Sequence, residues 1–511
     1  MRFKPRILVI KRCLVIFDEW AHVASYNNET IIEDPNTRNF WGQSLDRMWT
    51  KTFEAEGGLG GAIWGMIDET FMLPENLEGF RKWWGIEDNT VQTYKGTTVG
   101  YGEWGIVDVW RRKKPEFWNT KKAYSPIRIM NTTIEGYKEG DSLKIPVYNR
   151  FDHTNLNEVT LAYTYNGVTK TLSPFDLPPH TRGEISLPIA KWKADKKIAV
   201  EFYNNNEKLI DRYLLSQKPG KTARQINSEE KVEVNRADNV LNFITSNGII
   251  SLDATTGLIT NIEKDGSNLA VSGPQMVYKT KGKAISYSSN QINNYSKNWN
   301  LNDINYALNN NEAVVTINGS YSSIIATFKI RIFYDGKIET TYSFENLPKE
   351  YVREVGVKYI LEDAITTLSW ERNGYWSAYP ENHLSALSGK TNLYPNTLNE
   401  YRQKPEKLWN EDTKSFYYEG TNKENSSELT RIAKATKENV YKYSLGNDKN
   451  KLITVQGNGV LSCRLSKTND HLELYLLNKL DYIDLSWGNY QRNFLLDGTY
   501  KGKAEFSLFP Q

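Results

Sequence analysis

Cysteine is nearly absent from this chain of 511 residues, which has only Cys13 and Cys463, at opposite ends. Two cysteines form at most one bridge, so a disulfide framework cannot hold the fold together. Long apolar runs are also missing, since no stretch of about 18 apolar residues predicts a membrane-spanning helix. We therefore expect no membrane partner.

The chain also lacks a strong excess of one charge. The chain has 64 Lys and Arg against 61 Asp and Glu, a formal net charge of +3, and the two signs are mixed along the sequence. Nucleic-acid-binding proteins concentrate Lys and Arg on one face, so we expect no nucleic-acid partner. The five histidines include no two at metal-ligand spacing, so the sequence predicts no zinc site.

Aromatic residues are abundant, with 15 Trp, 31 Tyr and 18 Phe. Such rings pack the cores of β-sandwiches, and they also stack on the apolar faces of sugars. We expect most of them to serve the cores. The basic first residues do not predict a signal peptide, because Lys11 and Arg12 interrupt the apolar stretch.

The first 126 residues alternate strand and helix signals. An apolar run at Leu14 to Phe17 predicts a buried strand, and apolar spacing from Asn36 to Glu54 predicts a helix that Gly57 and Gly58 end. A second buried strand is expected at Gly61 to Ile67, and a helix with Pro at its first turn at Pro115 to Ala123. This order predicts a parallel unit from the end of a (β/α)8 barrel.

The rest of the chain predicts two all-β domains. Residues 127–222 fit an immunoglobulin-like β-sandwich, and residues 223–511 fit one large supersandwich, with a linker at about Gln217 to Asn227. The fold class is thus multidomain. Expected strands are Ser142–Asn149, Val159–Tyr165, Ala199–Asn204, Val314–Asn318, Ser322–Phe333 and Glu339–Phe344, and expected turns are Asn166–Gly167, Arg182–Gly183, Asn247–Gly248, Asp335–Gly336 and Asp497–Gly498.

Glu19 is the strongest candidate for chemistry. It follows the first apolar run, at the end of a barrel strand, where (β/α)8 enzymes place catalytic groups. A lone buried charge is costly, so such a position favours function, although a solvated Asp18–Glu19 pair is the alternative. A retaining glycosidase needs an ionised carboxylate as nucleophile and a second carboxyl about 5 Å away.

Other candidates surround this position in the predicted barrel. Trp64 lies in the second strand and Asp68 just beyond it; a Trp at a barrel mouth stacks on a sugar or else packs a loop. His22 comes three residues after Glu19 and could donate to a sugar hydroxyl or be structural.

The sequence resembles family 2 glycoside hydrolases of the large β-galactosidase type. Phe17-Asp18-Glu19-Trp20-Ala21-His22 resembles the family's nucleophile motif, and Gly60 to Asp68 resembles the next barrel strand. Asn149 to Leu156 is similar to the family's second immunoglobulin-like domain. Asp253 to Leu258, Gly273–Pro274, Trp370 and Tyr379-Pro380-Glu381-Asn382 are similar to its β-galactosidase small-chain domain.

This resemblance implies roles for particular residues. Glu19 would be the nucleophile, His22 would contact the sugar near its 6-position, and Trp64 would form the sugar platform, with Asp68 also in the substrate pocket. Trp487 is a candidate contact from the large sandwich, with a core ring as the alternative reading. The substrate would be an oligosaccharide or polysaccharide with terminal β-galactosides or related β-glycosides.

Three departures from the family pattern qualify these expectations. The acid/base Glu, about six barrel strands and the N-terminal sandwiches have no counterpart here. The family's sodium-binding Asn corresponds to Trp104, so we expect no cofactor. The loop from Leu73 to Glu103 is long and aromatic, which bears on the sugar accepted.

Three hypotheses follow from these observations. The chain is a glycosidase fragment that acts with the missing N-terminal half, a non-catalytic carbohydrate-binding or complementing module, or the remnant of a broken gene. Family members of this type work in the cytoplasm or the periplasm, so localisation is open.

Overall fold

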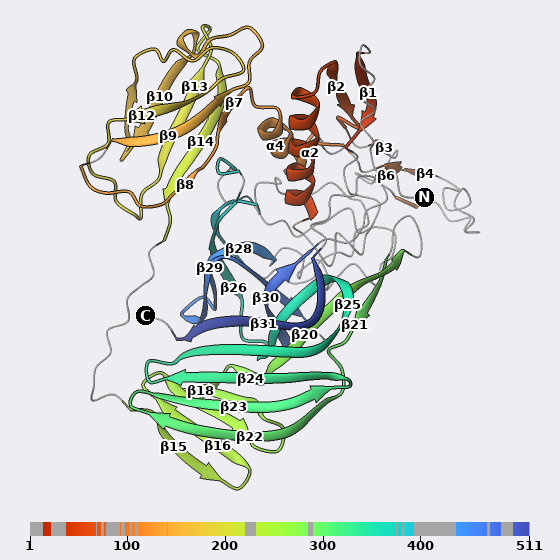
Figure 1. Cartoon of the computed structure of the whole chain (residues 1–511), viewed down its shortest axis with the longest axis vertical. Helices are drawn as coiled ribbons and strands as arrows, with labels where there is room; N and C mark the ends of the chain where they lie inside the picture. Colours follow the sequence, from red (N-terminus) through yellow and green to blue (C-terminus); the bar gives the residue numbers. More distant parts are fainter. Residues whose placement is uncertain are drawn as a thin grey trace.

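The computed structural model describes most of the chain, in segments. The described residues are 14–21, 37–67, 69–72, 76–77, 92–93, 98–102, 105–107, 111–140, 142–219, 231–284, 290–374, 376–380, 383, 385–392, 436–467, 471–481 and 494–509. Within them the chain is mostly β-strand, and its α-helices are α2 and α4. Figure 1 shows these two helices near the N-terminal strands, a separate β-sandwich, and a large β-structure.

The N-terminal part contains both α-helices and six short strands. Their bounds are β1 Val15–Trp20, α2 Thr37–Phe53, β2 Gly58–Ile63, β3 Glu69–Met72, β4 Asn76–Leu77, β5 Gln92–Thr93, β6 Thr98–Gly102 and α4 Pro115–Ala123. Strands β1 and β2 pair in parallel with α2 between them in sequence. The predicted strand–helix–strand order is therefore confirmed, as is the helix at Pro115.

The predicted burial of the first two strands is wrong for the described residues. Leu14 is 73% exposed and Ile16 69% exposed, and Val15 and Phe17 are exposed as well. Parallel sheets are normally covered on both faces. In β1, by contrast, Trp20 is buried and the five residues before it are exposed. The second strand also begins earlier than expected, because the backbone N–H of Val15 donates to Gly57 O at 2.8 Å and Gly58 already pairs with Val15.

The middle part forms two sheets around one core. Its elements are β7 Ile127–Ile129, β8 Thr133–Ile134, β9 Leu143–Asn149, the 3-10 helix η1 Leu156–Glu158, β10 Thr160–Tyr165, β11 Val168–Thr171, β12 Arg182–Leu187, β13 Ile198–Tyr203 and β14 Leu209–Gln217. The sheets have the orders β11-β10-β13-β14-β8 and β12-β9-β7. Buried Ile145, Ile185, Val200 and Leu215 from both sheets share the core.

The predicted strands of this part match β9, β10 and β13 within two residues at each end, but the turn at Arg182–Gly183 is wrong. Gly183 lies inside β12 and pairs with Val147. A Cβ on Gly183 would come within 2.8 Å of Leu177 Cδ1. Close packing against Leu177, and not a turn, therefore accounts for this glycine.

The C-terminal part is a larger two-sheet structure. Its strands are β15 Glu233–Ala237, β16 Val240–Thr245, β17 Gly248–Asp253, β18 Leu258–Lys264, β19 Ser267–Asn268, β20 Ala270–Ala284, β21 Asn290–Asn294, β22 Trp299–Asn309, β23 Glu312–Tyr321, β24 Ile324–Phe333, β25 Lys337–Glu362, β26 Thr367–Arg372, β27 Ser388–Asn392, β28 Lys437–Gly446, β29 Lys451–Lys467, β30 His471–Leu480 and β31 Leu495–Leu508. Strands β15 to β19 form one sheet, and the others form a sheet of 12 strands.

One hydrophobic core joins these two sheets, with Phe243 and Ile259 from the smaller and Phe328, Val357 and Leu474 from the larger. The hairpins at Asn247–Gly248 and Asp335–Gly336 are confirmed. The hairpin at Asp497–Gly498 is wrong, because Gly498 lies inside β31 opposite Leu347, where the register shifts.

Candidate functional site

Glu19 and Trp64 lie at the same end of neighbouring parallel strands. Glu19 is the next-to-last residue of β1, and Trp64 directly follows β2. The backbone N–H of Trp64 donates to Trp20 O at 3.3 Å, which joins the two strand ends. Glu19 and Trp64, whose side chain is 41% exposed, therefore lie on neighbouring strands at the carboxyl end of the pair.

A β-bulge lies at Glu19. Phe17 pairs with Gly61 and Trp20 with Ile63, so two residues of β1, Asp18 and Glu19, stand opposite one residue of β2. The rings of Phe17 and Trp20 stack with centroids 5.6 Å apart, which places them on one side of the strand. Bulges re-aim side chains and are over-represented beside active sites. Both carboxylates of the motif therefore occupy an irregular position that regular pairing would not provide.

The helix α2 holds the backbone just after Glu19. The indole N–H of Trp41 donates to Ala21 O at 3.0 Å, and Ala21 has a φ of 50°, in the left-handed region. Trp20 is buried against Gly61, where a Cβ would come within 2.6 Å of its ring. The sequence analysis did not identify Trp41 as a residue that supports the site. The signal available for it was its position on the predicted helix.

A third segment extends the parallel arrangement beyond β2. The N–H of Ile106 donates to Gly65 O at 3.0 Å, and the N–H of Val107 donates to Met66 O at 3.0 Å. Ile67 and Val107 form a parallel bridge. Trp20 therefore holds the backbone at Trp64, and residues 105–107 hold the backbone that follows it.

Three of the predicted site residues, His22, Asp68 and Trp487, lie outside the described residues. Trp104, which the resemblance aligns with a sodium-binding Asn, also lies outside them. Within the described segments, no group of three or more His, Cys, Asp or Glu side chains is arranged to hold a metal ion. No helix of that same part is long and apolar enough to cross a membrane.

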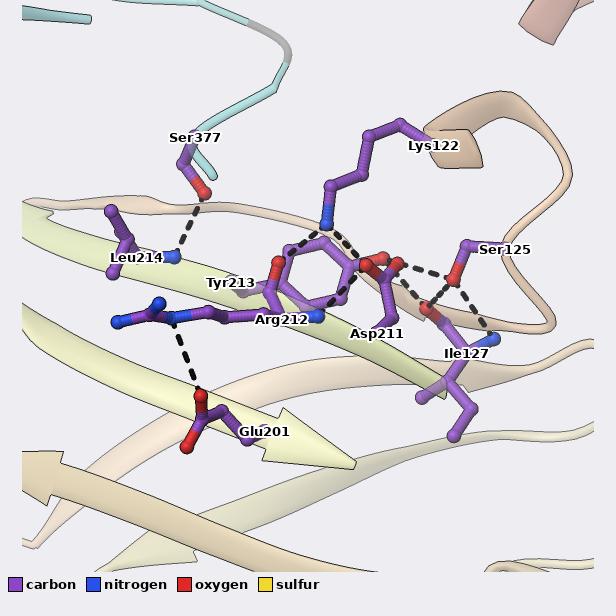
Figure 2. Close-up of polar contacts among 9 residues, drawn as sticks. All are labelled: Lys122, Ser125, Ile127, Glu201, Asp211, Arg212, Tyr213, Leu214 and Ser377. Carbon is purple, nitrogen blue, oxygen red and sulfur yellow. Dashed lines mark hydrogen bonds and ion pairs between the residues drawn. The ribbon is translucent and has the colours of Figure 1, made fainter. Parts of the chain in front are cut away.

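A buried polar junction joins α4 to the sandwich. Figure 2 shows the ammonium of Lys122, at the end of α4, donating to Asp211 and to Arg212 O on β14. The Tyr213 hydroxyl donates to Ile127 O at 2.6 Å. The large β-structure reaches the same place, because the N–H of Leu214 donates to Ser377 Oγ at 2.9 Å.

A second buried contact joins α2 to this junction. The guanidinium of Arg128 donates to Asp46 on α2 at 2.5 Å and lies 4.6 Å from the ring centre of Trp376. The helix that positions Ala21 is therefore tied both to the sandwich and to the large β-structure. Through Arg128, the sandwich and Trp376 are thus linked to the helix whose Trp41 donates to Ala21 O.

The junction predicts a pH dependence of stability. Burial, opposed by the Asp211 carboxylate, lowers the pKa of Lys122 from 10.5 to about 8. Between these values the unfolded chain holds a proton that the folded chain has lost. The free energy of unfolding should therefore rise with pH from about 8 to 10.5. Urea unfolding at several pH values checks this, and a Lys122→Met variant with the same slope would contradict it.

No family model matches the chain, and no curated protein matches it. Among solved structures, the Slr1438 protein from Synechocystis sp. PCC 6803 is 12% identical with a TM-score of 0.28, covering 57% of this chain and all of that one. A putative aldose 1-epimerase from Escherichia coli K12 is 10% identical with a TM-score of 0.27, covering 54% and 98%.

An exo-chitosanase from Amycolatopsis orientalis is 10% identical, with a TM-score of 0.19. The alignment covers 65% of this chain and 28% of the exo-chitosanase chain. Because all three TM-scores lie below 0.5, the functional proposal rests on the residues of the chain itself.

Proposed function

We propose that this chain is the nucleophile-bearing part of a retaining β-glycosidase, with terminal β-galactosides as the first substrates to test. The observation that supports the proposal is the bulge at Asp18 and Glu19, near the carboxyl end of a strand that runs parallel to the strand before Trp64. A carboxylate in this position can attack an anomeric carbon, and an exposed indole can stack on the sugar ring. The motif from Phe17 to His22 supports the same role.

In this mechanism Glu19 attacks the anomeric carbon and the glycosidic oxygen leaves. A glycosyl ester forms on the Glu19 carboxylate, and water then hydrolyses it. An acid must protonate the leaving oxygen, and such assistance is typically worth about 10²–10⁴-fold in rate. The resemblance gives no position in residues 1–511 for that acid, so we propose that the N-terminal half of the barrel, outside this sequence, supplies it.

Exposed apolar residues in and beside β1 and β2 support the need for further barrel strands. Leu14, Ile16, Leu59 and Met66 are all more than half exposed. All-parallel sheets bury both faces, so the further strands of a (β/α)8 barrel would cover these side chains. The strands described here would then be the last ones of the catalytic domain.

A covalent label tests the nucleophile without the missing acid. A 2-fluoro-galactoside with a dinitrophenyl leaving group is a suitable reagent. Because dinitrophenolate departs without protonation, Glu19 alone should form a stable ester with the fluorosugar. We expect intact-mass spectrometry to show an increase of one fluorosugar in the unmodified chain and in Asp18→Asn, and none in Glu19→Gln. Peptide mapping should place the adduct on Glu19.

Two results would count against this proposal. An adduct that persists in Glu19→Gln would assign the nucleophile elsewhere. No adduct on the chain, alone or together with a polypeptide carrying the preceding barrel strands, would remove the glycosidase assignment. Saturable sugar binding without any adduct would instead favour a carbohydrate-binding module.

A further inference from the structure

The motif that begins at Tyr379 lies in the large β-structure, and its first residue contacts the N-terminal part. The Tyr379 hydroxyl donates to Asn119 Oδ1 on α4 at 3.0 Å. The ring of Tyr379 stacks on the imidazole of His383, with centroids 4.8 Å apart and planes 10° apart. His383 is fully buried, and its Nδ1 accepts a hydrogen bond from the N–H of Ser385 at 3.1 Å. The tyrosine therefore reaches α4 from a firmly held base.

The hydrogen bond between Tyr379 and Asn119 has a defined direction. Burial raises the pKa of the Tyr379 phenol, so the hydroxyl keeps its proton at neutral pH and remains a donor. The amide oxygen of Asn119 accepts that proton, and the whole asparagine is buried. The bond therefore orients the Asn119 side chain from the large β-structure.

Asn119 packs closely against α2 at Gly42. Helices α2 and α4 lie side by side (Figure 1). A Cβ on Gly42 would come within 2.5 Å of Asn119 Cγ and 2.6 Å of Asn119 Cβ. Only glycine permits such a close approach. The position of Asn119 therefore limits how α2 can shift or rotate at this turn.

The residue before Gly42 holds the end of the strand that carries Glu19. The indole N–H of Trp41 donates to Ala21 O at 3.0 Å, and Ala21 has a φ of 50°. Residues other than glycine rarely adopt this left-handed conformation, and they keep it only when the surrounding structure holds it. Glu19 lies two residues before Ala21. A displaced indole would therefore release the backbone next to the carboxylate.

We infer that Tyr379 is a positioning residue for Glu19. It acts through the contact of Asn119 with Gly42, which fixes the helical turn that holds Trp41. Contiguous packed side chains of this kind can carry coupling between distant parts of a protein. The catalytic consequence rests on the proposed function, whereas the effect on Trp41 is independent of any activity. The large β-structure would thus support the nucleophile without touching the substrate.

The indole N–H signal of Trp41, in the full chain labelled with ¹⁵N at tryptophan, reports the position of this side chain. Its absence in Trp41→Phe assigns the signal. In Tyr379→Phe, which removes only the hydroxyl, we expect the signal to shift and its hydrogen exchange to accelerate about three- to tenfold, as for the loss of one hydrogen bond. The indole of Trp192, which donates to Lys196 O at 2.8 Å inside the sandwich, should keep its signal and its exchange rate.

The rate of labelling by the 2-fluoro-galactoside tests the consequence for Glu19. Tyr379→Phe should lower the maximal labelling rate constant about three- to tenfold and leave the half-saturating reagent concentration within about twofold, because positioning acts on the chemical step. Trp41→Phe should lower the same rate constant at least as much.

Tyr359→Phe is the matched control. Its hydroxyl is also buried in the large β-structure and shares a hydrogen bond with the Thr340 hydroxyl at 2.6 Å. This variant should lose a similar amount of thermal stability, with no change in the Trp41 signal or in the labelling rate constant.

Three results would overturn the inference. They are an unchanged Trp41 signal in Tyr379→Phe, a shifted signal with an unchanged labelling rate, and an equal loss of labelling rate in Tyr359→Phe. A chain that is not labelled at all would count against the proposed function, and the Trp41 signal would then decide whether Tyr379 fixes the strand end.

Discussion

Lys122→Met is expected to lower the free energy of unfolding by about 3–5 kcal/mol, the usual cost of removing one partner of a buried ion pair. Asp211 is fully buried, so its carboxylate would lose the ammonium that compensates its charge. The variant also removes the contact of Lys122 with Arg212 O. Urea unfolding followed by circular dichroism and by tryptophan fluorescence measures the change.

The double variant Lys122→Met/Asp211→Leu is the control for this prediction. Replacing both members of a buried pair by apolar residues is often neutral or stabilising, so it should recover most of the loss. Lys191 pairs with Glu139 at 2.9 Å, but both side chains are more than 60% exposed. Lys191→Met should therefore change the free energy by about 0–1 kcal/mol. Similar small effects at Lys122 would show that the junction is not tightly docked.

Gly356→Ala is expected to destabilise the large sheet by about 3 kcal/mol or more, at the upper end for an overpacked core. A Cβ on Gly356 would lie 2.1 Å from Leu476 O and 2.8 Å from Leu477 Cα. These are backbone atoms of β30, so no side-chain rotation relieves the clash. Strands β25 and β30 would have to separate where Gly356 pairs with Leu477.

Thermal unfolding and the yield of soluble protein measure the effect of Gly356→Ala. Gly65→Ala is the control for stability, because an added Cβ there meets nothing within 4 Å. We expect the control to unfold within a few degrees of the unmodified chain. A Gly356→Ala variant that unfolds at the same temperature as the control would mean that β25 and β30 are not paired in this register.

Local sequence signals predicted the helices accurately. The helix α4 spans Pro115–Ala123 as expected, because Pro at its first turn is a strong local start signal. The helix α2 spans Thr37–Phe53, within one residue of the expected bounds. Both signals depend on neighbouring residues, so the rest of the fold was not needed to read them.

Long strands were harder to predict, because their continuity depends on distant partners. The pattern predicted a strand only at Glu339 to Phe344, whereas β25 continues to Glu362. Pro348 reads as a break, but it lies at a register shift between Leu347 and Glu350, opposite β31. Bulges accommodate Pro within sheets. The same pairing explains why Gly498 belongs to a strand and not to a hairpin.

The candidate site was predictable only in part. The motif around Glu19 indicated the carboxylate, and the strand–helix–strand order placed Trp64 near it. The bulge at Glu19 could not be read from the sequence, since it is defined by the pairing of Phe17 and Trp20 with β2.

The pairing of β25 with β31 has a consequence for biosynthesis. Lys337 pairs with Ser507, 170 residues further along the chain. At about 5–20 residues per second, a ribosome needs roughly 9–34 s to make that interval. During this time β25 has one of its long edges without its final partner, while the sandwich is already complete. We expect the sandwich to become protease-resistant on the ribosome well before the large sheet does.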